Sequence, residues 1–115
     1  MMLDLKSRSG RINISLIIHR LGQDCIISIT GGDRPHIGVV YIGCRDGIID
    51  KTIYRNHKEE EIVNKVSMSL ITGKWFDHFV VIGGIHLDDI TLQEINEVNS
   101  MCDALIGRME EYLNN

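Results

Sequence analysis

The fold class is indicated most clearly by residues 79–113, FVVIGGIHLDDITLQEINEVNSMCDALIGRMEEYL. This segment opens with an aromatic and β-branched run, Phe79 to Ile82, which is typical of a short buried strand. Thr91 and Glu94 then have the spacing of a capping box at a helix start. Apolar residues follow every three or four positions, as one buried helix face requires: Ile95, Val98, Cys102, Leu105, Met109 and Leu113. The segment predicts a strand, a loop and a long amphipathic helix.

The residues before this segment predict more strands than helices. Alternating or continuous apolar runs and one Asp-Gly hairpin signal predict four strands, over residues 11–20, 25–30, 37–44 and 48–53. An apolar repeat at helical spacing, with Asn56 and Glu59 placed as a capping box, predicts a helix over 58–72. This order predicts an α+β fold, a single mostly antiparallel sheet of about five strands with two helices on one face. We expect residues 1–115 to form a single α/β domain.

Two of the predicted strands, over 25–30 and 37–44, are apolar on both faces. Such strands are usually covered on two sides. Two helices on one face leave the other face open, and a large apolar patch is unusual on a monomer. We therefore expect a homodimer or a larger homo-oligomer that buries the open face.

Composition excludes several classes of partner. The formal net charge of -4 comes with no basic stripe and 5% of the residues are aromatic, so we expect no nucleic-acid partner. No apolar run approaches the length of about 18 residues that crosses a bilayer, so we expect no membrane partner. The three cysteines lack the paired spacing of a zinc or redox motif. This pattern predicts reduced thiols and a cytoplasmic protein.

The first candidate loop covers residues 31–38. Gly31 and Gly32 let backbone N–H groups approach a ligand, and Gly38 keeps the next strand unobstructed. Arg34 supplies a planar fork of donors beside His36. These are the parts of a phosphate site, although a wide turn with a surface arginine has the same sequence.

The second candidate loop, residues 54–61, enters the first predicted helix. A helix N-terminus attracts anions through its free N–H groups, and His57 and Lys58 add donors. The three glutamates that follow oppose an anion there. An ordinary capped helix start with a solvated first turn is therefore the alternative.

The third candidate loop, residues 83–89, lies between the last predicted strand and helix. In extended backbone, His86 and Asp88 point the same way and could present a nitrogen and an oxygen to one metal ion. Alternatively, Asp88 or Asp89 merely begins the helix, although with Thr91 as its cap at least one aspartate is spare. Because each loop holds one histidine at the end of a strand or helix, the three loops could converge on one ligand.

Three motifs in this order, GGDRPHIG at 31–38, NHK at 56–58 and GIHLDDIT at 84–91, resemble the prenylated-flavin chaperone family (LpdD-like). Its members include the small D subunit associated with gallate-type decarboxylases. The resemblance implies a protein without chemistry of its own that holds reduced prenylated FMN and delivers it to a UbiD-type hydroxyarylic acid decarboxylase. A flavin prenyltransferase would supply the cofactor. Two positions depart from the family pattern: Arg55-Asn56 stands where a Pro-Gly pair precedes the second histidine, and Asp89 stands where an asparagine is usual.

The resemblance carries the family's histidine loops over to His36, His57 and His86. Together with the loop analysis it predicts a cofactor-binding set of Gly31, Gly32, Arg34, His36, Gly38, His57, Lys58, Gly84 and His86. The apolar wall for the flavin ring would come from Ile, Val and Trp75, across a subunit boundary.

Two alternatives remain open from the residues alone, and with them whether the protein catalyses a reaction. One is a small metal-dependent enzyme with His36, His57, His86 and Asp88 as metal ligands. The other is a purely structural accessory subunit of a decarboxylase.

Overall fold

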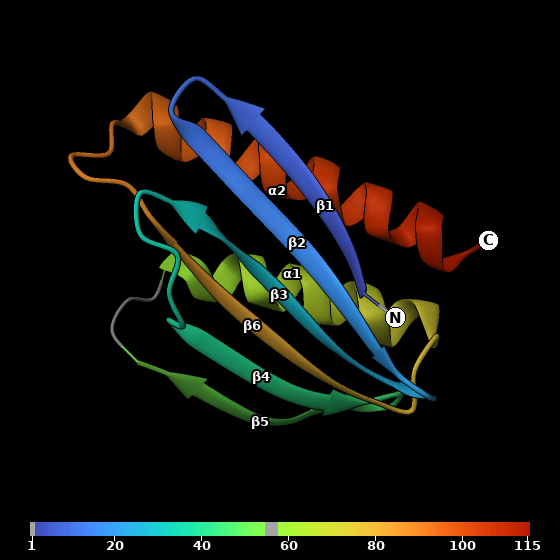
Figure 1. Cartoon of the computed structure of the whole chain (residues 1–115). Coiled ribbons are helices and arrows are strands. Elements are labelled where there is room, and N and C mark those ends of the chain that lie inside the picture. Colours follow the sequence, from blue (N-terminus) through green and yellow to red (C-terminus); the bar gives the residue numbers. More distant parts are fainter. Residues whose placement is uncertain (1, 55–57) are drawn as a thin grey trace.

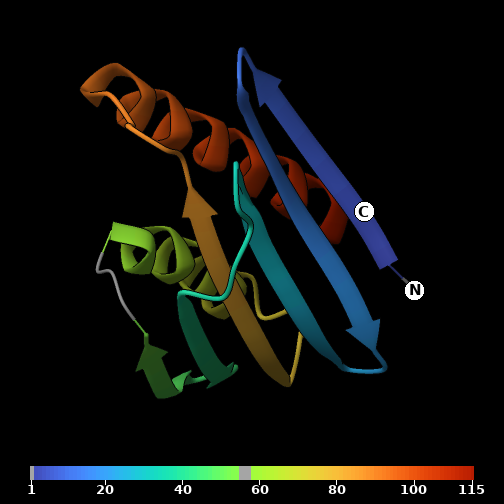
Figure 2. The same ribbon diagram turned by 60° about the vertical axis from the view of Figure 1, so that its left-hand side comes forward.

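The computed structural model describes residues 2–54 and 58–115, apart from the Lys58 side chain. These residues form β1 (Met2–Ser9), β2 (Ile12–Leu21), β3 (Asp24–Gly32), β4 (Val39–Cys44), β5 (Gly47–Ile53), α1 (Lys58–Gly73), β6 (His78–His86) and α2 (Leu92–Leu113). The strands make one sheet in the order β1-β2-β3-β6-β4-β5, in which only β3 and β6 are parallel neighbours. Both helices lie on the same face of the sheet (Figure 1, Figure 2). The predicted α+β fold is confirmed.

The sheet has one strand more than the five expected, because β1 adds an edge strand. Its sequence carries two spaced leucines, Leu3 and Leu5, among charged and polar residues. Pairing with β2 runs along its whole length, and Leu5, opposite Leu16, is 9% exposed. Long-range pairing thus stabilises a segment that is too polar to be recognised as a strand from its own sequence.

Strand β6 continues beyond the predicted end at Ile82 to His86. It pairs with β3 along this extension, where His86 lies opposite Gly32. The two glycines before Ile85 resemble a loop signal, but a side chain on Gly84 would collide with the carbonyl of His36, which crosses it. Gly84 therefore marks a close crossing of two backbones, not a turn.

The core lies between the helices and the sheet. Helix α2 starts with the predicted capping box, because Thr91 Oγ1 accepts a hydrogen bond from Glu94 N–H at 3.1 Å and Glu94 Oε1 accepts one from Thr91 N–H at 3.1 Å. Four residues of its predicted apolar face are buried, and the two end residues, Ile95 and Leu113, are half-buried. Helix α1 matches its predicted range closely, although its predicted cap, Asn56, lies outside the described residues.

The cysteines are all free thiols. Burial raises the pKa of both Cys25 and Cys102 to about 12, so these two thiols stay protonated and unreactive. Cys44 is half-buried near the end of β4.

The face of the sheet opposite the helices has an apolar centre. Strand register places six half-buried or exposed aliphatic residues there in neighbouring rows: Ile17, Ile26, Val40, Ile42, Val80 and Ile82. Ile42 is 41% exposed. Within the described ranges, neither helix is long and apolar enough to cross a membrane.

Candidate functional site

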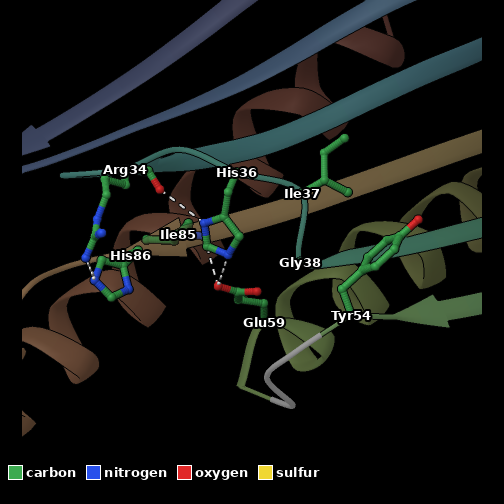
Figure 3. Close-up of a pocket in the computed structure, with 8 residues that line it drawn as sticks. All are labelled: Arg34, His36, Ile37, Gly38, Tyr54, Glu59, Ile85 and His86. Carbon is green, nitrogen blue, oxygen red and sulfur yellow. Dashed lines mark hydrogen bonds and ion pairs between the residues drawn. The ribbon is translucent and has the colours of Figure 1, made fainter.

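A cavity of about 650 Å³ opens at the edge of the sheet where the parallel strands β3 and β6 end and α1 begins. Such edges, at the carboxyl ends of parallel strands, are common places for ligands. The volume lies in the range of small-molecule pockets. Figure 3 shows the lining residues Arg34, His36, Ile37, Gly38, Tyr54, Glu59, Ile85 and His86.

The loop between β3 and β4 passes close over the end of β6. Gly38 N–H donates to the Gly83 carbonyl at 2.8 Å, and the Gly38 carbonyl accepts from Tyr54 N–H at 2.8 Å. These bonds tie the loop to β6 on one side and to the end of β5 on the other. The loop therefore forms one wall of the cavity.

Glu59 lies on the cavity floor and is 7% exposed. Its Oε1 accepts a hydrogen bond from Ile85 N–H at 3.2 Å and lies 3.2 Å from His36 Nε2. The other ring nitrogen of His36 is 3.1 Å from the Arg34 carbonyl, which can only accept, so Nδ1 carries a proton. The His36 ring therefore connects the Arg34 carbonyl to the Glu59 carboxylate.

The second carboxylate oxygen of Glu59, Oε2, is buried and has no hydrogen-bond partner among the described residues. It lies against Gly38, where a Cβ atom would collide with it. An unpaired buried acceptor is costly, and more so when it carries charge. This oxygen is therefore suited to accept a hydrogen bond from a ligand in the cavity.

Arg34, His86 and Asp88 form a second polar group at the mouth of the cavity. Arg34 Nη2 donates to Asp88 Oδ1 at 2.8 Å, and His86 Nε2 lies 2.9 Å from each of these two atoms. The hydrogen bonds from His86 and then from Arg34 lower the pKa of Asp88. Because the Arg34 and Asp88 side chains are 69% and 60% exposed, their ion pair is weak and can exchange partners.

A charged cluster at the end of the first hairpin holds this mouth in position. Arg11 donates from Nε and Nη2 to the two carboxylate oxygens of Glu94, at 2.7 and 2.9 Å, and from Nη2 to the Asp88 carbonyl at 2.8 Å. Asp33 accepts from Asp88 N–H at 3.0 Å, while its own N–H donates to the His86 carbonyl at 2.7 Å. The Arg11 hydrogen bond, with that of Thr91, lowers the pKa of Glu94 to about 2. The cluster therefore connects the loop after β3 to the loop after β6.

Four of the predicted binding residues line the cavity: Arg34, His36, Gly38 and His86. The other three glycines lie outside the lining, because each lets two backbones approach closely. A Cβ atom would collide with the Asn13 carbonyl from Gly31, with the His86 carbonyl from Gly32 and with the His36 carbonyl from Gly84. His57 lies outside the described residues, and of Lys58 only the backbone, at the start of α1, is described.

Glu59 was not predicted as a site residue, because its sequence position indicates a helix cap and a solvated first turn. Helical spacing could have predicted that Glu59 is buried. It lies three and four positions before Ile62 and Val63, on the apolar face of the helix. A carboxylate on the buried face of a helix needs a partner inside the protein. That partner is the His36 ring.

The metal ligands expected from the sequence are not brought together by the described residues. His36 is engaged with Glu59, and His86 with Asp88 and Arg34. The described part of the chain holds no group of three or more histidine, cysteine or acidic residues that could bind a metal ion. The predicted metal site is therefore not supported.

The apolar wall of the cavity also differs from the expectation. Trp75 lies just beyond the far end of α1, against Gly73, and its Nε1 donates to Asn114 Oδ1 at 3.2 Å. The apolar lining comes instead from Ile37, Tyr54 and Ile85 of the same chain.

Comparison with known proteins gives one match. The family model of the prenylated flavin chaperone LpdD-like domain matches residues 8–114. A search of curated proteins finds no match. The family match covers every strand and helix that lines the cavity.

Proposed function

Because the chain belongs to the prenylated flavin chaperone LpdD-like family, we propose that it holds reduced prenylated FMN in the 650 Å³ cavity and delivers it to a UbiD-type decarboxylase. In this proposal the protein binds and transfers the cofactor without changing it. The observation that carries it is the buried Oε2 of Glu59, which has no hydrogen-bond partner among the described residues and belongs to a residue that lines a cavity with a cation at its mouth and apolar side chains on its wall.

The phosphate of the ligand fits the mouth of the cavity. Arg34 uses one nitrogen, Nη2, for Asp88 and His86, and its other N–H groups have no partner among the described residues. A phosphate can accept two parallel hydrogen bonds from such a guanidinium. Because the Arg34–Asp88 pair is exposed and weak, a phosphate can compete with Asp88 at little cost.

The ring system fits the inner part of the cavity. The side chains of Ile37 and Tyr54, at the opening of the cavity, are 56% and 62% exposed. Such high exposure is unusual for two large apolar side chains at one opening. A flavin ring placed between them covers apolar surface that water otherwise meets. The ring also carries N–H groups that need an acceptor, and Glu59 Oε2 supplies one.

Two partners follow from this role, a flavin prenyltransferase that supplies the cofactor and the decarboxylase that receives it. The open face of the sheet supports a further contact, because its central aliphatic residues are uncovered by either helix. We place the interface of a homodimer or larger homo-oligomer on this face. None of these aliphatic residues lines the cavity, so the proposed interface and the proposed ligand site use different residues.

A transfer experiment tests the proposed function. The protein is loaded anaerobically with reduced prenylated FMN, freed of excess ligand by gel filtration and mixed with a cofactor-free UbiD-type decarboxylase. We expect decarboxylase activity to appear in proportion to the loaded protein, and the released flavin to be chemically unchanged. A protein that retains no flavin on the column, yet still activates a preloaded decarboxylase, would instead be a structural accessory subunit.

A further inference from the structure

A second, smaller cavity adjoins the first. Its volume is about 190 Å³, and it lies between the first turns of α1 and α2 and the end of β6. Three residues line both cavities: Glu59, Ile85 and His86. The rest of its lining is Ile62, Leu87, Ile90, Ile95, Val98 and Asn99, in which Asn99 is the one polar side chain.

We propose that this second cavity is the subsite for the prenyl-derived carbons of the ligand, and that it lets the protein distinguish prenylated FMN from FMN. The inference rests on the proposed function, because it assigns the flavin ring to the first cavity. Prenylation adds only carbon and hydrogen to the flavin. The added group therefore needs an apolar surface and offers no hydrogen bonds that a polar site could use.

The lining and size of the second cavity match that need. Its floor is formed by buried aliphatic side chains, with Ile62, Leu87 and Val98 each below 9% exposure. At its rim, Ile90 is 38% exposed and Ile95 is half-buried. A liquid water occupies about 30 Å³, so this volume holds roughly six water-sized groups, enough for a single isoprene unit.

The shared residues set the direction in which a ligand would enter. Glu59 is common to both cavities, and its Oε2 has no hydrogen-bond partner in the described part of the chain. A ring that donates an N–H to this oxygen lies at the boundary, with its phosphate end toward Arg34 and its opposite edge toward the aliphatic floor. One ligand with a polar tail and an apolar addition thus spans both spaces.

Affinity for two ligands separates this inference from the proposed function. The wild-type protein is titrated anaerobically with reduced FMN and with reduced prenylated FMN, and binding is followed by flavin fluorescence. One carbon more in an apolar pocket changes binding by about tenfold or more, so we expect prenylated FMN to bind at least about tenfold more tightly. If neither flavin binds, the proposed function itself fails. If both bind equally, the function stands and the subsite does not.

Two matched variants locate the subsite. Asn99→Phe places a large side chain in the second cavity, whereas Asn96→Phe makes the same change at an exposed position of α2 that lines neither cavity. We expect Asn99→Phe to weaken binding of prenylated FMN by about tenfold and to leave FMN binding within twofold. Asn96→Phe should change neither affinity. Equal losses for both flavins in Asn99→Phe would overturn the inference.

A third variant keeps the inference testable if Asn99→Phe fails to fold. Ile90 lies in the loop before α2 and is partly exposed, so Ile90→Ala removes apolar rim without disturbing the core. We expect several-fold weaker binding of prenylated FMN and unchanged binding of FMN. Wild-type affinity for prenylated FMN in this variant would place the added carbons elsewhere.

Discussion

Replacing Glu59 by glutamine separates the two roles of this side chain. In the free protein Oε1 accepts from Ile85 N–H and faces His36, both at 3.2 Å, while Oε2 is buried without a partner among the described residues. Glutamine keeps the shape and one carbonyl acceptor, so the bond from Ile85 survives. It removes the negative charge and turns one of the two oxygens into an N–H donor.

The expected loss concerns binding more than stability. A hydrogen bond to a charged acceptor contributes about 1.5 to 3 kcal/mol, so we expect Glu59→Gln to weaken binding of reduced prenylated FMN by about 2 kcal/mol, or about thirtyfold. The free protein gains stability from the loss of a buried charge, but the amide NH2 group that replaces Oε2 is itself unpaired there, so its stability changes little. The lost pairing with His36, whose side chain is 37% exposed, offsets part of that gain.

Anaerobic fluorescence titration measures the affinity, and urea unfolding of the ligand-free protein measures the stability. Glu61→Gln is the matched control, since Glu61 lies in the same helical turn with a 71% exposed side chain and faces Lys65 at 4.0 Å. Wild-type affinity in Glu59→Gln, or an equal loss in the control, would refute a ligand bond to Oε2. A drop of more than about 2 kcal/mol in the free energy of unfolding would make Glu59 a structural residue instead.

Three further predictions address the mouth, the core and the pH dependence. Arg34→Ala removes a charge-assisted contact to the phosphate, so binding of reduced prenylated FMN should weaken by about 2 kcal/mol, while the thermal midpoint of the free protein, measured by circular dichroism, stays unchanged. Leu105→Ala empties a fully buried position and should lower the free energy of unfolding by about 2 to 4 kcal/mol in urea, whereas His19→Ala on the open face should be nearly neutral. The lowered pKa of Glu94, about 2 against an ordinary 4.5, gives stability that is present above pH 4.5 and is lost as the pH falls toward 2. Urea unfolding between these pH values should therefore show a steeper loss for the wild-type protein than for Glu94→Gln, and parallel curves would contradict the assignment.

Much of the fold could be predicted from local pattern, because its two helices and five of its six strands carry their own apolar pattern. The capping box of Thr91 and Glu94 fixed the start of α2 to the residue. The parts that were missed depend on distant partners. Strand β1 has too little apolar sequence to be recognised without β2, and the end of β6 looks like a loop because Gly84 is needed for a backbone crossing that only the folded chain contains.

The candidate site was predicted less completely, for a related reason. Residue type was enough to predict four residues that line the cavity: Arg34, His36, Gly38 and His86. It did not predict the hydrogen-bond or ion-pair partner of each one. One alternative left open by the sequence was that the histidines share a metal ion. In the structure each described histidine of the site faces a carboxylate instead, and one of these carboxylates, Glu59, comes from a turn that was interpreted as solvated.

A crystal structure of the protein with reduced prenylated FMN, from crystals grown under anaerobic conditions, would show where the cofactor binds. We expect one flavin per chain, with its phosphate on Arg34, a ring N–H donating to Glu59 Oε2 and the ring in contact with Ile37 and Tyr54. A flavin bound on the open face of the sheet, or a complex in which the cavity remains filled by solvent, would contradict this expectation.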